Sequence, residues 1–254
     1  MRNQQRERRI LNLLQQRGDL SVAALCDALD VSEATVRREL QALERRGLLK
    51  RLHGGATLAG VNGLEPQFQD KQEANREAKE AIAAAALALI EDGDDIYLDG
   101  GSTVLALARL LHRKRHLTIV TNSLMAAATL MDTEHRLILV GGEFRPKSRV
   151  MIGPLTTPII STLRVRKSFM GTIGLTVADG MTTTDPGEAY TKEQIMQRSQ
   201  RVILLADHGK FGVASFARSG SLDDIDTIIT DEIDGDWQRE LDQHDVHVLL
   251  APIA

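Results

Sequence analysis

The sequence predicts an α/β protein in two parts: a small N-terminal domain of short helices and a larger α/β domain with a largely parallel sheet. Through residues 6–46, apolar residues recur every three or four positions, which is typical of short amphipathic helices. From about residue 76, helical segments alternate with short uninterrupted apolar runs, which is typical of strands buried on both faces. The chain has 254 residues, 43% of them hydrophobic, which is enough for two such domains.

Charge separates the two parts. Residues 1–60 contain 11 of the 31 Lys and Arg residues but only 7 of the 35 Asp and Glu residues, although the whole chain has a net charge of −4. A basic N-terminal part joined to an acidic remainder favours nucleic-acid binding by the N-terminal part alone.

Cysteine content and hydropathy indicate a compartment. The single cysteine, Cys26, excludes an internal disulfide and fits a reducing environment. The first ten residues lack the apolar stretch of a secretion signal, and the longest apolar run, Ala81–Ile90, is too short to span a bilayer. We therefore expect a soluble cytoplasmic protein with no membrane partner.

The N-terminal part, expected at residues 1–56, has three helical segments and a β-like ending. The third segment begins with Ser32, a capping-type residue. In this segment Val36, Leu40 and Leu43 recur at spacings of four and three, which predicts one buried face.

The second and third segments have the proportions of a helix-turn-helix. A helix that reads the major groove needs small polar and basic side chains near its N-terminus. The following segment, "LLKRLHGGAT", fits a β-wing that contacts phosphates or the minor groove. The candidate DNA-binding residues are Ser32, Glu33, Thr35, Arg37, Arg38, Lys50, Arg51 and His53. The alternative is an amphipathic helix pair with solvated arginines.

Residues 57–75 mix glycine, proline and polar residues, and we interpret them as a linker that precedes a second domain at 76–254. Ligands of parallel sheets gather at the carboxyl ends of the strands. The candidate strands are the apolar runs at 96–99, 117–121, 137–142, 168–174, 202–207, 227–231 and 246–250.

The segment "DGGST", 99–103, follows one of these runs and opens a helix. Its glycines allow close backbone approach, and the N–H groups of the helix start can bind an anion together with the Ser and Thr hydroxyls. The alternative is a simple turn with a hydroxyl cap. The spacing excludes both a Walker A loop and a dinucleotide fingerprint.

Two motifs in the N-terminal part resemble the DeoR family of bacterial transcription regulators. "VSEATVRREL" is similar to the start of that family's recognition helix, and "RLHGGA" is similar to its wing. Glu39 stands where the family usually has Asp, and Cys26 where it usually has Ala. The resemblance covers nearly the whole chain. In residues 182–212, Glu188 and Lys192 match an acidic-Ala-x-x-Lys helix that precedes "LADxxKFG" in the family's sensor domain.

The same segment is also similar to ribose-5-phosphate isomerase. Aligned on Gly187 and Thr191, the isomerase base falls on Glu193 and its active-site lysine falls on Thr184. Isomerisation needs a base and a cation or acid that stabilises the enediolate. Threonine cannot supply that charge, so we expect a pocket that holds a sugar phosphate without isomerising it, with no catalytic residue and no cofactor.

The resemblance implies a transcription regulator, most often a repressor, that binds double-stranded operator DNA and responds to a phosphorylated sugar or related metabolite. Because a palindromic operator needs at least a dimer, we expect a homo-oligomer, either a dimer or a tetramer. The candidate effector-binding residues are Asp99, Gly100, Gly101, Ser102, Thr103, Asn122, Gly141, Glu188, Lys192, Asp207 and Lys210.

Other classes are weaker alternatives. One is an isomerase-like enzyme with an accessory DNA-binding domain, and another is a binding module whose basic domain ignores DNA sequence. His112 and His116 have a spacing that can ligate a metal, but the basic residues between them disfavour a cation, so no metal site is expected.

Overall fold

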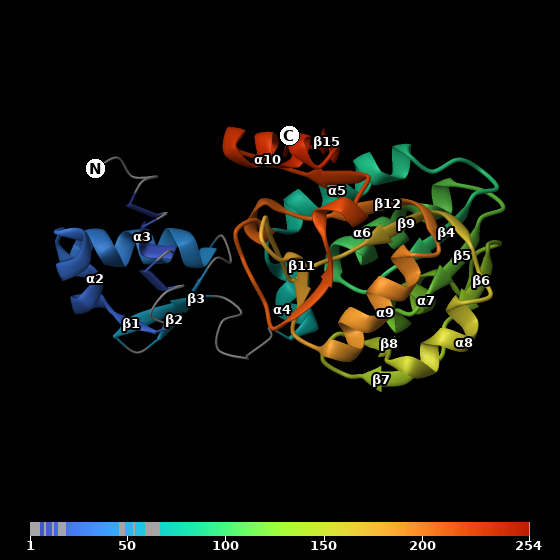
Figure 1. Cartoon of the computed structure of the whole chain (residues 1–254), viewed down its shortest axis with the longest axis horizontal. Coiled ribbons are helices and arrows are strands. Elements are labelled where there is room, and N and C mark those ends of the chain that lie inside the picture. The colour runs from blue at the N-terminus through green and yellow to red at the C-terminus, as the bar shows by residue number, and fades with distance from the viewer. Residues whose placement is uncertain are drawn as a thin grey trace. The chain divides into compact units, whose positions relative to one another are not determined.

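The computed structural model describes residues 6–7, 9–11, 13–14, 19–45, 49–52, 54–58 and 67–253. The chain divides into two compact units, Met1–Pro66 and Gln67–Ala254 (Figure 1).

The first unit has the architecture expected of a winged helix-turn-helix. Its helices α2 (Val22–Leu29) and α3 (Glu33–Arg45) are joined by a short turn. Its antiparallel sheet, in the order β1-β3-β2, is formed by β1 (Leu20–Ser21), β2 (Leu49–Leu52) and β3 (Gly55–Leu58).

The predicted buried face of α3 is confirmed. Val36, Leu40 and Leu43 are fully buried, in a core that also contains Ile10 from the first helical segment. The Gly-Gly turn of the wing has a packing reason, because a Cβ on Gly55 would lie 2.3 Å from the backbone oxygen of Leu20. Only glycine therefore allows β3 to approach β1 at this point.

The linker expected at 57–75 is too long at both ends. Thr57 and Leu58 complete β3, residues 59–66 lie outside the described part of the chain, and Phe68–Glu73 form helix α4. Phe68 is buried in the core of the second unit. Sequence periodicity missed α4 because a single aromatic side chain anchors this short helix.

A seven-stranded sheet forms the second unit, and the order of its strands is β15-β14-β12-β9-β4-β5-β6. All neighbouring strands are parallel, so every predicted apolar run contributes one strand to a single parallel sheet. The strands are β4 (Asp95–Leu98), β5 (Thr118–Thr121), β6 (Arg136–Leu139), β9 (Val165–Met170), β12 (Ser199–Leu205), β14 (Thr227–Thr230) and β15 (His247–Leu250).

Helices cover both faces of this sheet (Figure 1). One core packs beneath α5 (Arg76–Ala88), α6 (Ser102–Leu110) and α7 (Leu124–Leu130). The opposite core packs beneath α8 (Thr157–Ile160), α9 (Pro186–Met196) and α10 (Gly235–Gln243). No helix in the described part of the chain is long and apolar enough to cross a membrane.

Two groups of short strands were not expected. A hairpin is formed by β7 (Glu143–Arg145) and β8 (Val150–Ile152), and a small antiparallel sheet is formed by β10 (Gly174–Thr176), β11 (Gly180–Thr183) and β13 (Ala217–Gly220). The run expected to be one strand at 168–174 is divided, because β9 ends at Met170 and β10 begins at Gly174. The residues between them form a loop beside the site.

Strand order places a crevice in the second unit. From β4 the chain adds β5 and β6 on one side, and then returns to add β9 on the other. In parallel α/β sheets, ligands bind beyond the carboxyl ends of the strands at such a reversal. The loops after β4 and β9 are therefore the first places to look for a site.

Candidate functional site

A pocket lies at this reversal point, between the loops that follow β4 and β9. It has about 480 Å³ of empty space, part of which is open solvent. The described residues that line it are Lys71, Gly100, Gly101, Ser102, Thr103, Val104, Ser148, Gly171, Thr172, Ile173, Glu188, Lys192, Leu205 and Lys210.

Seven predicted effector-binding residues line this pocket: Gly100, Gly101, Ser102, Thr103, Glu188, Lys192 and Lys210. Asp99 and Asp207 are not lining residues. Asp99 pairs with Lys192, which lines the pocket, and Asp207 caps the turn that ends at the lining residue Lys210. Asn122 and Gly141 are not among the lining residues. The amide of Asn122 instead donates to the backbone oxygen of Met151 at 3.0 Å, which attaches β8 to the end of β5.

The N-terminus of α6 supplies donors for an anion. Gly101 is the N-cap residue, with φ of +128°, and the first helical N–H to bond back to it is that of Leu105 at 3.0 Å. The N–H groups of Ser102, Thr103 and Val104 come before this bond, and all three residues line the pocket. Such a helix start favours a phosphate through its N–H groups and its dipole.

Gly100 makes room for the hairpin that closes this side of the pocket. A Cβ at this position would lie 2.3 Å from Cγ1 of Val150 on β8. The glycine is therefore needed for packing as well as for access to the backbone.

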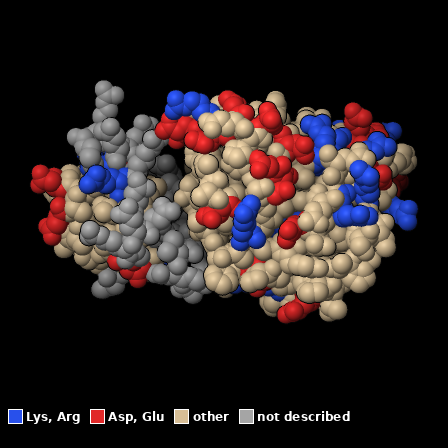
Figure 2. Space-filling view, in the orientation of Figure 1, with Lys and Arg blue, Asp and Glu red and all other residues tan. Residues whose placement is uncertain are grey.

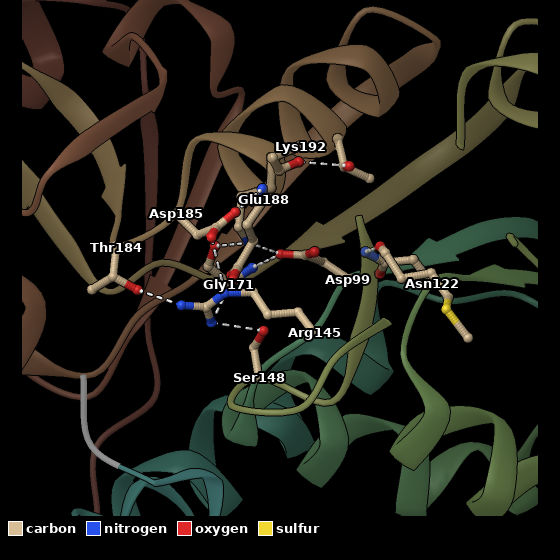
Figure 3. A network of polar contacts seen from close by, with 12 residues as sticks. Asp99, Asn122, Arg145, Ser148, Gly171, Thr184, Asp185, Glu188 and Lys192 are labelled. Carbon is tan, nitrogen blue, oxygen red and sulfur yellow. Dashed lines mark hydrogen bonds and ion pairs between the residues drawn. The ribbon is translucent and has the colours of Figure 1, made fainter. Parts of the chain in front are cut away.

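A buried ion pair joins α9 to the reversal point (Figure 3). The ammonium of Lys192 contacts Oδ2 of Asp99, and both residues are 2% exposed. The same ammonium donates to the backbone oxygen of Gly171 at 2.9 Å, and the N–H of Gly171 donates to Asp99 Oδ2 at 3.0 Å. The predicted ligands Asp99 and Lys192 thus neutralise each other and hold the β9 loop.

Arg145, from β7, organises the start of α9 (Figure 3). Its guanidinium donates to Oγ of Ser148 at 3.0 Å and to Oγ1 of Thr184 at 3.3 Å. It also pairs with the carboxylates of Asp185 at 3.3 Å and Glu188 at 3.4 Å. Glu188 therefore faces the pocket with its charge balanced by Arg145.

These contacts revise the comparison with an isomerase. Glu193, on which the isomerase base falls, is exposed and lines a different groove with Met196 and Arg218. Successive helical residues point in different directions, so Lys192 faces the pocket and Glu193 does not. Thr184 does have a cation beside it, from Arg145, but two carboxylates already pair with that cation.

A second polar group supports the loop that carries Lys210. Asp207 is the N-cap residue of a short turn, His208–Lys210, and its Oδ1 accepts from Gly209 N at 3.1 Å. The same oxygen accepts from Nδ2 of Asn75 at 2.7 Å, which ties the turn to the start of α5.

His208 also fixes this turn. Its Nδ1 lies 2.6 Å from Oδ2 of Asp231, and its backbone N–H donates to Oδ1 of the same residue at 2.8 Å. The hydrogen bond with Asp231 raises the pKa of His208. Burial by itself would raise the pKa of Asp231, but the hydrogen bonds from His208 hold it below its ordinary value. The pair is therefore stabilised in its charged form.

Sequence reasoning missed several residues of the pocket and of the network that supports it. Gly171 lies inside an apolar run, where an isolated glycine is a recognised sign of a break or a close approach. Lys71 was hidden in the expected linker. Arg145 and Ser148 had no signal, because the hairpin that carries them shows no clear periodicity.

In the first unit, α3 presents the predicted DNA-contacting side chains on its exposed face. Ser32, Glu33, Arg37 and Arg38 are exposed, and Thr35 is half-buried. The hydroxyls of Ser32 and Thr35 lie 3.0 Å apart at the start of the helix. Arg37 pairs with Glu33, at 2.8 Å from Nε and 2.6 Å from Nη2. Arg37 must therefore exchange this partner if it is to contact DNA.

The wing is described in part. Lys50 is exposed on β2, whereas Arg51 is half-buried and its backbone N–H donates to Oε1 of Glu44 at 2.9 Å. His53 lies outside the described residues. On the face shown in Figure 2, acidic and basic side chains of the second unit are interspersed.

A helix-turn-helix unit joined to a larger α/β unit with a pocket at its strand reversal is the architecture of a ligand-responsive class of transcription regulator. The chain belongs to the DeoR family of these regulators. Residues 6–60 match the DeoR-like helix-turn-helix domain, and residues 74–232 match the DeoR C terminal sensor domain.

Several relatives match along most of their length. The chain is 35% identical to the HTH-type transcriptional regulator GlpR of Haloferax volcanii, over 96% of each chain. It is also 35% identical to the glycerol-3-phosphate regulon repressor of Escherichia coli, over 91% of this chain and 92% of that protein. A third relative is the HTH-type transcriptional regulator IolR of Bacillus subtilis, 31% identical over 99% of each chain.

Solved structures resemble the chain more distantly. A ribose 5-phosphate isomerase A from Methanocaldococcus jannaschii matches with a TM-score of 0.40 and 18% identity, over 54% of this chain and 55% of that one. The translation initiation factor eIF-2B of Pyrococcus horikoshii OT3 matches with a TM-score of 0.43 and 16% identity, over 85% and 70% of the two chains.

Proposed function

We propose that this regulator represses an operon for the catabolism of a carbohydrate or polyol, and that a phosphorylated sugar or related metabolite in the pocket relieves repression. The observation that carries the effector proposal is the start of α6, where Ser102, Thr103 and Val104 line a pocket that Lys71 and Lys210 also line. Helix donors and ammonium groups around one cavity are suited to a phosphate.

The charges around the pocket favour an anionic ligand. Lys192 is neutralised by Asp99, whereas Arg145 is shared between Asp185 and Glu188. The ammonium of Lys210 has no hydrogen bond or ion pair within the described residues, and it lines the same cavity. The name of the Escherichia coli relative, the glycerol-3-phosphate regulon repressor, is consistent with a phosphorylated effector.

DNA binding is tested with the full chain and fluorescently labelled duplexes. At about 0.15 M salt, DNA from upstream of the protein's own operon should bind at least about 10³-fold more tightly than random duplex, as specific complexes do. Equal affinity for both duplexes would overturn the operator proposal. Arg38→Ala should weaken operator binding, whereas the matched control Arg113→Ala, an exposed arginine of the second unit, should not.

Effector binding is tested by thermal shift with a panel of sugar and polyol phosphates. A ligand present at about 100 times its Kd stabilises the native state by about 2.7 kcal/mol. The unphosphorylated sugars are the controls, and we expect them to give no shift. A thermal shift with the unphosphorylated sugars but not with their phosphates would contradict the phosphate site.

We also propose that the protein acts as a homo-oligomer, a dimer or a tetramer, because paired helix-turn-helix units match a palindromic operator. Sedimentation equilibrium of the full chain, with and without operator, would establish its mass. A monomer on the operator would contradict this proposal.

A further inference from the structure

Along the chain, helix α4 follows the DNA-binding unit and begins the unit that contains the effector pocket. The first unit ends at Pro66, and α4 (Phe68–Glu73) is the first helix of the second unit. One residue of α4, Lys71, lines the effector pocket. Any ligand that contacts Lys71 therefore contacts the helix to which the DNA-binding unit is covalently tethered.

The docking of α4 depends on few groups. Phe68 is the only residue of the helix that is buried, and the guanidinium of Arg149 lies 5.1 Å from the centre of its ring. The ammonium of Lys71 lies 6.0 Å from the same ring. A short helix with one buried side chain can change its position or its opening rate when a single further contact is gained.

Polar contacts from the start of α5 reach both the end of α4 and the turn that carries Lys210. The ammonium of Lys79, on α5, donates to the backbone oxygen of Lys71 at 2.5 Å and also to that of Ala74. Next to them, Asn75 donates to Asp207, the cap of the turn that carries Lys210. The end of α4 and the Lys210 turn are thus held by adjoining bonds.

The positive charges of Lys71, Lys79 and Lys210 act on one another in this region. The pKa of Lys79 is lowered to about 8, chiefly by burial and also by the positive charges of Lys210 and Lys71, against the opposing effect of Asp207. An anion between Lys71 and Lys210 would offset the repulsion among the three ammonium groups.

We propose that Lys71 is a ligand of the effector's phosphate and that this contact tightens the docking of α4, which makes α4 the element that couples the pocket to the DNA-binding unit. This inference rests on the proposed phosphate site. It adds Lys71 to that site and gives an order of events. The anion binds between the start of α6 and α4, and its binding changes α4 before it changes the first unit. A ligand shifts a conformational equilibrium only by the difference between its affinities for the two states. Here that difference comes from the contact with Lys71.

Amide hydrogen exchange of the full chain tests the coupling, with inorganic phosphate as the probe. Saturating phosphate should slow exchange in two separate segments, 100–105 at the start of α6 and 67–75 around α4. Lys71→Met should keep the protection of 100–105 but lose that of 67–75. Lys71→Arg should restore it, because the charge is retained. Gln69→Ala, an exposed neighbour on α4, is the matched control and should behave as the wild type.

The outcomes separate the two proposals. If phosphate protects neither segment in the wild type, the phosphate site is wrong and the coupling falls with it. If phosphate protects 100–105 but not 67–75, the site stands and the role of α4 is wrong. Full protection of 67–75 in Lys71→Met would also overturn that role.

The same variants have a functional readout. Once the thermal-shift panel has identified a phosphorylated effector, that compound should weaken operator binding by the wild type by about 5–150-fold, the usual range of allosteric coupling. In Lys71→Met the ratio of operator affinities without and with effector should fall below about 3-fold. An unchanged response in this variant would contradict the proposal.

Discussion

The ammonium of Lys192 on α9 lies against the carboxylate of Asp99 at the end of β4, and both residues are 2% exposed. The two residues come from distant parts of the chain, and Gly171 completes their network from a third. A buried pair of this kind contributes little beyond its own desolvation, but removal of one partner leaves an uncompensated charge.

Lys192→Met should therefore reduce the stability of the second unit by about 3–5 kcal/mol. The measurement is denaturant unfolding followed by the fluorescence of Trp237, the single tryptophan of the chain, which lies in this unit. The Asp99→Asn/Lys192→Met double variant should lose less than the sum of the single variants. Strict additivity would show that the pair does not interact. The exposed Arg76, paired with Glu80, is a control whose change to Ala should leave the stability nearly unchanged.

Arg145→Gln should loosen the start of α9, because it removes the contacts to Thr184, Asp185 and Glu188. Hydrogen bonds to charged groups contribute about 1.5–3 kcal/mol, and we expect a loss in that range by the same fluorescence measurement. Arg145→Lys should restore only part of it, because an ammonium cannot reproduce the planar fork of a guanidinium. Full restoration by lysine would show that charge alone matters here.

Gly100→Ala should be destabilising for a steric reason that can be reversed. The added methyl would lie 2.3 Å from Cγ1 of Val150, and overpacking of this kind typically costs about 1–3 kcal/mol. Val150→Ala removes the clashing atom, so the double variant should recover part of the stability lost by Gly100→Ala. If Val150→Ala adds its own cost without recovery, the loss at Gly100 comes from backbone conformation instead.

The pH dependence of stability should reflect the His208–Asp231 pair. The pKa of His208 is raised from its ordinary 6.5, so its contribution is fully present below that value and is lost as pH rises through the raised pKa. The pKa of Asp231 is lowered from 3.8, so its contribution is present above that value and is lost as pH falls through the lowered pKa. The pair should stabilise most between these two ordinary values.

The difference in melting temperature between the wild type and His208→Gln should therefore be larger at about pH 5.5 than at about pH 9. His247→Gln, an exposed histidine of β15, is the control. A difference that grows with rising pH would contradict the assigned charge state.

The Glu33–Arg37 pair on α3 gives a prediction for DNA binding. Glu33→Ala should strengthen binding to random duplex, because it removes a negative charge and frees Arg37 for a phosphate. Arg37→Ala should weaken binding and reduce the salt slope by about 1. Anisotropy titrations of the full chain over a range of salt concentrations measure both. An unchanged slope in Arg37→Ala would show that Arg37 does not contact the DNA backbone.

The sequence by itself determined the secondary structure that depends on long, regular patterns. Seven apolar runs became the seven parallel strands because strands buried on both faces must be apolar throughout. The buried stripe of α3 and the glycines before α6 were also readable, since their roles depend on near neighbours in the chain.

Only the tertiary structure decided how the pocket is completed. Arg145 reaches Glu188 from a hairpin 43 positions earlier, and Lys71 reaches the pocket from a helix that composition had hidden in a linker. The tertiary structure also brings Asp99 and Lys192 together as an ion pair. The pairing of these charges is set by strand order and packing, which produce no periodic pattern in the sequence. The charged residues of the site could therefore be predicted from the sequence, but their partners could not.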